Sequence, residues 1–154
     1  MIVQYQRVRD DARRPTRGHP SDAGLDIYFC PPDNATSSMR ITPGEGQLLQ
    51  TGLRFEVPHG YMLEVKNRSS VAAKRSLIVG ACVIDSGYAG EVFVNLHNIG
   101  TETQLVEPYT KIAQLVMVPV VSFQPFENKE GELYEYPVTM SARATGALGS
   151  ADAT

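Results

Sequence analysis

An acidic residue and a tyrosine flank a glycine in residues 80–91, near the middle of the chain. Asp85 ends a short apolar run, Gly87 lets the chain turn, and Tyr88 follows directly. A carboxylate can bind a hydroxyl group or activate a water molecule, and an aromatic ring can press against a sugar or a base. The stretch therefore fits a small site for a sugar or nucleoside. Taken alone, the stretch fits a plain β-hairpin better, because Asp-Ser-Gly-Tyr is ordinary turn chemistry between strands.

Four further clusters carry side chains suited to phosphate or metal binding. Asp26 follows Gly24 at a strand start, and Gln114 is polar within an apolar run. Residues 68–70 (Arg-Ser-Ser) combine a guanidinium and two hydroxyls at a predicted helix start, where backbone N–H groups also favour anions. Arg143 opens a glycine-containing tail, 143–150, that could close over an anionic ligand. Taken singly, each cluster also has a structural explanation: a turn, a capped helix, a solvent-facing glutamine or a frayed terminus.

The elements that must position these clusters are almost all β-strands. Residues 91–98 alternate cleanly between apolar and other side chains, and residues 111–121 form a long β-rich run with Pro119 near its end. One segment, 69–74, favours a short helix with a serine cap. Many short strands with almost no helix predict an all-β sandwich or barrel. The expected strands are residues 2–8, 24–29, 47–50, 52–57, 61–66, 77–84, 91–98 and 111–121.

Length and composition indicate one globular domain. The chain has 154 residues, of which 42% are hydrophobic and 20% charged, enough to bury a core. We predict a single β domain over residues 1–140 and a flexible C-terminal arm over 141–154, which has too little apolar area to order itself. The net charge of −3 argues against nucleic-acid binding, which needs a concentrated basic face.

The two cysteines, Cys30 and Cys82, are well separated and have no metal-ligand spacing. Without a secretory signal they are expected to be reduced, buried thiols of a cytoplasmic protein. The longest late apolar run, residues 115–121, is short and contains Pro119, so no membrane span is expected.

In order and residue type, the five clusters resemble the five motifs of the trimeric dUTPase family, the deoxyuridine triphosphate nucleotidohydrolases. The strongest matches are residues 23–26, 68–70, 81–90 and 112–115. The resemblance implies an all-β jelly roll of the β-clip type, with one short helix and a mobile C-terminal tail. It also implies a homotrimer with active sites shared between subunits. Such enzymes use Mg²⁺ to hydrolyse dUTP to dUMP and pyrophosphate, which limits uracil in DNA and supplies dUMP for thymidylate synthesis.

The resemblance also implies roles for individual residues. Asp85 would bind the deoxyribose 3′-hydroxyl and orient the attacking water, and Tyr88 would pack under the deoxyribose. Asp26 would support Mg²⁺ through water, and Arg143 would clamp the phosphates from the tail. The remaining substrate-binding positions would be Arg68, Ser69, Ser70 and Gln114 on phosphate oxygens, the backbone near Val79, Ala81 and Val83 on the uracil edge, and Leu148, Gly149 and Ser150 in the tail.

Several positions depart from the family pattern. Asn67 replaces a proline, Cys82 a glycine, and Gly87 an acid before the tyrosine. Leu148 replaces a phenylalanine that stacks on uracil, so we expect weaker closure of the tail. Alanines at 144 and 147 and the pair Ala-Asp at 151–152 also differ from the usual tail.

Two other functions fit the same fold. The sister family of dCTP deaminases is similar around residues 85–88, but it needs a glutamate where this chain has Asn95, and an amide cannot act as a general acid or base. A mixed preference for dCTP and dUTP hydrolysis remains open. The altered tail is the one feature that favours a non-catalytic nucleotide-binding or regulatory module.

Overall fold

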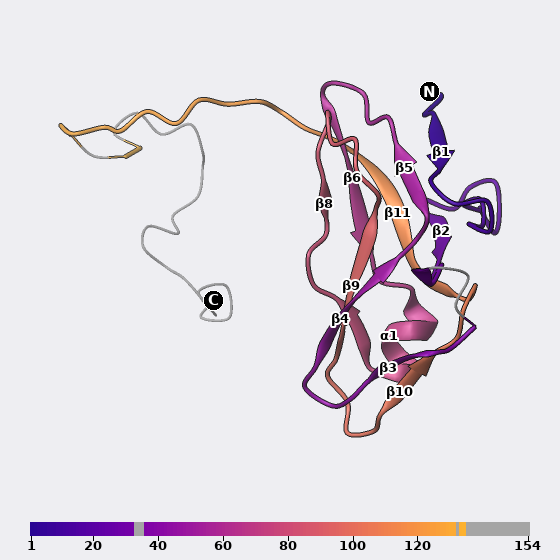
Figure 1. Ribbon diagram of the computed structural model, residues 1–154. Coiled ribbons are helices and arrows are strands. Elements are labelled where there is room, and N and C mark those ends of the chain that lie inside the picture. The colour runs from indigo at the N-terminus through magenta and orange to yellow at the C-terminus, as the bar shows by residue number, and fades with distance from the viewer. Residues whose placement is uncertain (33–35, 132, 135–154) are drawn as a thin grey trace. The chain divides into compact units, whose positions relative to one another are not determined.

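The computed structural model describes residues 1–32, 36–131 and 133–134 (Figure 1). The chain divides into two compact units, Met1–Ser122 and Phe123–Thr154, and the strands and the helix named below all lie in the first. This unit is mostly β with one short helix, as expected. The predicted domain boundary after residue 140 and the arm over 141–154 lie outside the described residues.

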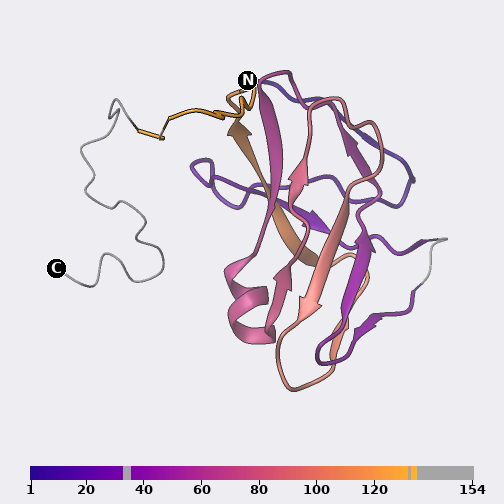
Figure 2. The ribbon, with the colours of Figure 1, turned by 90° about the vertical axis from the view of Figure 1, so that its left-hand side faces the viewer.

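The strands form two main antiparallel sheets. The larger sheet has the order β2-β11-β6-β8 and contains Leu25–Tyr28, Lys111–Pro119, Tyr61–Lys66 and Val83–Ile84. The second has the order β4-β9-β7 and contains Gly46–Gln50, Phe93–Asn98 and Leu77–Val79. Two short ribbons pair β1 (Tyr5–Arg7) with β5 (Leu53–Phe55) and β3 (Met39–Ile41) with β10 (Gln104–Val106). Helix α1 (Ser69–Arg75) directly follows β6 (Figure 2).

The core lies between the inward faces of these sheets. Leu63 and Leu115 from the larger sheet join Leu49, Val94 and Leu96 from the second in one buried cluster. Their burial follows the predicted alternation: in β9, Val94 and Leu96 are buried while Phe93 is exposed. Each such side chain contributes about 1.5–3 kcal/mol when fully buried, which holds the two sheets together.

Several boundaries agree with the sequence. The strand expected over residues 61–66 is present, and β11 ends at Pro119 because proline cannot donate to the ladder. The helix is present, but the predicted serine cap is wrong. Arg68 occupies the N-cap position without a side-chain hydrogen bond, and Ser69 and Ser70 lie within the first turn. The strands β3 and β10 are absent from the sequence-based expectation, because each is only three residues long.

The expected continuous strand over 77–84 is wrong. β7 pairs with β9 in the second sheet, whereas β8 pairs with β6 in the larger one. The chain thus crosses between the sheets at residues 80–82. For the same reason residues 80–91 are not a hairpin, since β8 and β9 belong to different sheets. The turn itself is confirmed: Gly87 has φ of 92°, and the Tyr88 N–H donates to the Asp85 carbonyl at 3.2 Å.

The cysteines are free, as predicted. Cys30 is buried, and burial raises the pKa of its thiol. Cys82 is only half-buried, so the expectation of two buried thiols holds for Cys30 alone. Among the described residues, no helix has the length and apolar character needed to cross a membrane.

Candidate active site

Asp26 lies at the centre of a carboxylate–cation cluster that it forms with Arg68 and Lys111. Its Oδ1 accepts a hydrogen bond from Arg68 Nε at 2.7 Å, and its Oδ2 lies 2.8 Å from Lys111 Nζ. The carboxylate is 13% exposed, whereas the two cations are 26% and 37% exposed. The cluster therefore presents two partly exposed positive charges around one shielded negative charge. A phosphate group is the kind of ligand that such a surface favours.

Gln114 and Asn67 border this cluster. In the sheet, Gln114 lies opposite Asp26 on β2 and opposite Lys66 on β6, so the β-register brings three sequence clusters together. The Gln114 Nε2 donates to the Asn67 carbonyl at 2.9 Å. The Asn67 side chain in turn accepts the Val79 N–H at 2.7 Å. Asn67 thus links the end of β6 to β7.

Ser69 and Ser70 open helix α1 next to Arg68. Both are exposed, and Arg68 Nη1 lies 3.4 Å from Ser70 Oγ. The N–H groups of Val71 and Ala72 donate to the Arg68 carbonyl, so they begin the helix rather than facing a ligand. The two hydroxyls remain on the surface beside the cluster.

Replacing Gly24 by alanine should disturb this cluster, because a Cβ atom there would clash with Gln114. It would lie 2.8 Å from Gln114 Cδ and 3.0 Å from Gln114 Cβ. We expect a loss of about 1–3 kcal/mol in the free energy of unfolding, as for other overpacked sites. Urea denaturation measures the loss. Gly18→Ala is the control, since its Cβ meets only the far end of Asp22, and equal stability of the two variants would contradict the expected clash.

A second group of residues surrounds a cavity of about 210 Å³ between the two sheets. Asp85 and Tyr88 line it from the turn, Ala81 and Val83 from the crossing and β8, and Asn95 from β9. Tyr88 is 46% exposed, and its hydroxyl donates to the Glu91 carbonyl at 2.8 Å. Asp85 is exposed, and within the described part of the chain its carboxylate makes no hydrogen bond or ion pair. The cavity thus offers an unengaged carboxylate and an anchored ring.

The expected uracil-edge residues take different positions around this cavity. Val83 is 56% exposed on its wall. The Ala81 N–H lies 3.4 Å from Asn95 Oδ1, and the Val79 N–H is bonded to Asn67. Two of the three backbone donors are therefore already engaged within the protein.

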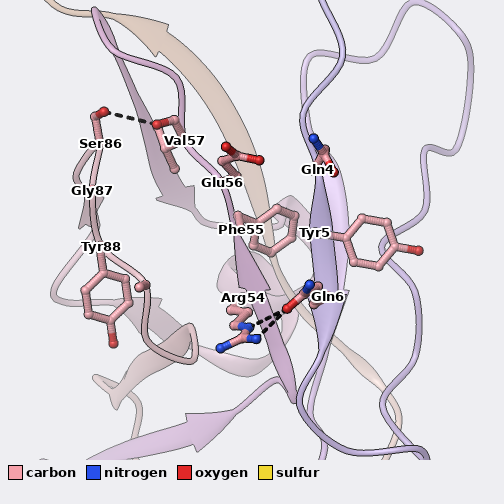
Figure 3. A pocket seen from close by; sticks show the side chains of 11 residues that line it. Gln4, Tyr5, Gln6, Arg54, Phe55, Glu56, Val57, Ser86, Gly87 and Tyr88 are labelled. Carbon is pink, nitrogen blue, oxygen red and sulfur yellow. Dashed lines mark hydrogen bonds between the residues drawn. The ribbon is translucent and has the colours of Figure 1, made fainter.

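The other side of the turn is open as well. A cavity of about 480 Å³ lies between residues 86–89 and the β1–β5 ribbon. Figure 3 shows the side chains that line it. The Ser86 hydroxyl, in the turn, donates to the Val57 carbonyl, just after β5, at 3.0 Å. Within the ribbon, Arg54 Nε donates to Gln6 Oε1 at 2.8 Å. The first bond ties the turn to the segment after β5, and the second joins β5 to β1 within the ribbon (Figure 3).

An ion pair remote in sequence anchors the Tyr88 ring. Arg9 lies 3.2 Å from Glu91 Oε1, which also accepts the Gly52 N–H at 2.7 Å. The side chains of Arg9 and Glu91 are 22% and 15% exposed, so the pair is largely shielded from solvent. Because the Glu91 carbonyl receives the Tyr88 hydroxyl, this pair fixes the residue against which the ring is held.

Substituting Arg9 by methionine should therefore destabilise the fold. The Glu91 carboxylate would lose its cation while staying shielded, at a cost of about 1–3 kcal/mol. Urea denaturation of Arg9→Met beside Arg7→Met gives the comparison, since Arg7 is exposed and, among the described residues, its side chain bonds only to the Asp10 carbonyl. Equal midpoints for the two variants would show that the Arg9–Glu91 pair contributes nothing.

Asp85 and the carboxylate–cation cluster lie toward opposite ends of β6, and the cavity beside Asp85 extends along the strand as far as Val65. Ile84 pairs with Leu63, so Asp85 lies level with Met62. The step from Met62 to Arg68 in extended backbone spans about 20 Å. That distance is longer than the separation between a nucleotide's sugar and its own phosphates.

The remaining predicted residues, Arg143, Leu148, Gly149 and Ser150, lie outside the described residues. Lys111, Arg9 and Glu91 belong to the candidate site but are not among the residues predicted from the sequence. For Lys111 a signal existed, since it stands at the start of the strand that carries Gln114. No local signal links Arg9 to Glu91, which are separated by 82 positions.

A mostly β fold with a carboxylate–cation cluster and a cavity lined by the Tyr88 ring defines a candidate nucleotide site. Comparison with known proteins agrees. The family model described as dUTPase matches residues 10–135. The deoxyuridine 5′-triphosphate nucleotidohydrolase of Chlamydia trachomatis is 38% identical over 118 residues, covering 75% of this chain and 77% of that protein. The corresponding protein of Clostridium acetobutylicum is 35% identical over 150 residues, covering 96% and 94%.

Solved structures give the same result. A Staphylococcus bacteriophage 80alpha dUTPase mutant with dUpNHpp has a TM-score of 0.78 at 25% identity, covering 97% of this chain and 98% of that one. The dUTPase from phage phi11 of S. aureus has a TM-score of 0.75 at 25% identity, covering 86% and 99%. The chain belongs to the dUTPase family. Its fold is the jelly roll of that family.

Proposed function

We propose that this protein is a dUTP diphosphatase that hydrolyses dUTP to dUMP and pyrophosphate with Mg²⁺, as a homotrimer. The observation that carries the proposal is the match of the dUTPase model over residues 10–135, which include both Asp85 with Tyr88 and the cluster of Asp26 with Arg68. The relatives named above for dUTP hydrolysis support the same substrate.

Asp85 orients the attacking water in this proposal. Its exposed carboxylate has no other partner among the described residues, so it can accept a proton from water and a hydrogen bond from the 3′-hydroxyl. The water oxygen forms a bond to the α-phosphorus, and the bond from that phosphorus to the bridging oxygen breaks. Pyrophosphate leaves with the bonding electrons, and the proton passes to Asp85. Tyr88 packs under the deoxyribose and leaves no room for a 2′-hydroxyl.

The phosphates bind at the carboxylate–cation cluster. Arg68 and Lys111 are close enough to Asp26 to neutralise it, and both are exposed enough to turn toward an anion. Ser69, Ser70 and Gln114 add donors beside them. Arg143 clamps the phosphates from the C-terminal arm, where Leu148 covers the base and Gly149 and Ser150 complete the substrate contacts.

The residues present fit a Mg²⁺ ion that is held mainly by the substrate. Among the described residues no group of three or more metal-binding side chains occurs, and both Asp26 oxygens already face cations. Mg²⁺ is reluctant to lose its waters and is commonly bound by one carboxylate together with substrate phosphates. Asp26 would therefore hold it through water. The bound ion supplies charge neutralisation on the phosphates.

The length of β6 supports active sites that are shared between subunits. The backbone of Asp85 lies about 20 Å from that of Arg68, which is longer than the distance between the sugar and the phosphates of one nucleotide. A neighbouring copy can bring its Asp85 cavity to this chain's phosphate cluster, as in closed homo-oligomers with one repeated interface. This geometry supports the proposed trimer.

Mixing two inactive variants tests the shared site. Trimers assembled from equal amounts of Asp85→Asn and Arg68→Ala chains should recover about a quarter of the wild-type sites, because one site in four combines both native residues. Pyrophosphate release is measured before and after co-refolding, with each variant refolded alone as the control. Co-refolded mixtures that stay inactive would mean that both residues act within one chain.

A side-by-side assay of dUTP, dCTP, dTTP and UTP tests the substrate. Turnover of dUTP to dUMP and pyrophosphate, well above that of the other three, is expected. Ammonia release from dCTP would favour a deaminase, and comparable hydrolysis of dCTP and dUTP a mixed enzyme. Tight binding of dUTP without turnover would favour a regulatory module.

A further inference from the structure

Asn95 lines the same cavity as Asp85 and Tyr88, and the proposed function gives it no role. It projects from the face of β9 opposite the buried Val94 and Leu96, and it is half-buried. Its neighbour on the same face is His97, also half-buried. The pair therefore lies on the wall of the cavity rather than in the core.

The contacts of Asn95 fix the orientation of its amide. The Ala81 N–H, which can only donate, lies 3.4 Å from the side-chain oxygen. His97 Nε2 lies 2.6 Å from the same oxygen, and two acceptors would repel at that distance. Nε2 must therefore carry a proton and donate to Oδ1. The amide oxygen is thus occupied twice from within the protein.

Two glycines shape the slot that holds this pair. A Cβ atom at Gly80 would lie 2.6 Å from His97 Nε2, and one at Gly46 would lie 2.6 Å from His97 Cε1. Any larger residue would push the imidazole away from Asn95. The close approach of backbone on both sides thus holds the donor in place.

The nitrogen of the same amide is left for a ligand. Within the described part of the chain Nδ2 makes no hydrogen bond. It is also not one of the side-chain atoms that are fully buried without a partner. Asn95 therefore presents N–H donors at the border of the cavity. Uracil carries a carbonyl acceptor at position 4, as thymine does, whereas cytosine carries an amino donor there.

We propose that Asn95, positioned by His97 and by the Ala81 N–H, selects uracil over cytosine by donating to the carbonyl at position 4. This inference rests on the proposed function. Cytosine would place its amino group against the Asn95 amide nitrogen, so two donors would face each other without an acceptor. A site built to donate to a substrate group strongly disfavours an analogue that cannot accept.

The test is the ratio of kcat/KM for dUTP to kcat/KM for dCTP. Asn95→Asp keeps the size of the side chain but presents an acceptor in place of the donor. The ratio should fall by about 100-fold, the size of effect expected when one polar partner is left unsatisfied. Asn95→Ala removes the donor without adding an acceptor, so its ratio should fall by a smaller factor and provides a second measurement if the aspartate variant fails to fold.

Further variants separate positioning from stability. His97→Phe should reduce the ratio several-fold, mainly through a higher KM for dUTP. His97→Gln can still donate to Asn95, so its ratio should stay close to that of the wild type. Gln47→Glu is the control for the added charge, because Gln47 lies on the adjacent strand opposite Leu96. Its ratio should match that of the wild type.

The outcomes distinguish this inference from the proposed function. A wild type that prefers dUTP, together with unchanged ratios in Asn95→Asp and Asn95→Ala, would overturn the inference alone. A wild type that neither hydrolyses nor binds dUTP would overturn both.

Discussion

Replacement of Asp85 by asparagine is expected to lower kcat for dUTP by about 10³-fold, within the range for loss of a general base. Asparagine keeps the shape of the side chain but cannot take the proton from the attacking water. Since Asp85 is exposed and its carboxylate has no partner in the described part of the chain, the fold should be unchanged. KM should change much less than kcat, because the amide still bonds to the 3′-hydroxyl.

Stopped assays of pyrophosphate release give kcat and KM for this variant. Asp10→Asn provides the matched control, since Asp10 is an exposed aspartate far from the cavity in sequence. Circular dichroism and gel filtration should match the wild type for both variants. Undiminished turnover by Asp85→Asn would remove Asp85 from the mechanism.

Deletion of residues 143–154 should have a comparable effect on turnover. In the proposed function the arm brings Arg143 to the phosphates, and an arginine that stabilises charge in phosphoryl transfer contributes about 10³-fold or more. In the same proposal the arm would exclude bulk water from the reacting phosphorus. We therefore expect kcat to fall by about 10³-fold in the truncated protein.

The assembly should survive this deletion, because the sheets that bury the core end with β11 at Pro119. Analytical ultracentrifugation of the truncated and full-length proteins measures the oligomeric state. Arg143→Ala isolates the contribution of the guanidinium, and deletion of residues 151–154 alone controls for chain length. A truncated protein that dissociates would show that the tail holds subunits together.

Local patterns predicted the strands that bury one face. The alternation of Val94 and Leu96 with polar neighbours marked β9, and Pro119 marked the end of β11. The turn at Gly87 was predictable from a different local signal, because a positive φ favours glycine. These features depend on residues close together in the sequence.

The sequence names candidate site residues but not the contacts between them. The Asp26–Lys111 ion pair and the proximity of Gln114 depend on the register between β2 and β11, which local periodicity does not specify. The division of residues 77–84 between two sheets likewise depends on the partners β9 and β6. The family resemblance named Asp26 and Gln114 as site residues, but it named neither the Lys111 partner nor the sheet crossing at residues 80–82.

Hydrolysis of dUTP in ¹⁸O-labelled water tests the central claim most directly. Water attack at the α-phosphorus places one labelled oxygen in dUMP and none in pyrophosphate, and mass spectrometry of the separated products measures both. We predict label in dUMP alone, with the rate of its appearance lowered by about 10³-fold in Asp85→Asn. Label in pyrophosphate, or no turnover of dUTP in the presence of Mg²⁺, would contradict the proposed reaction.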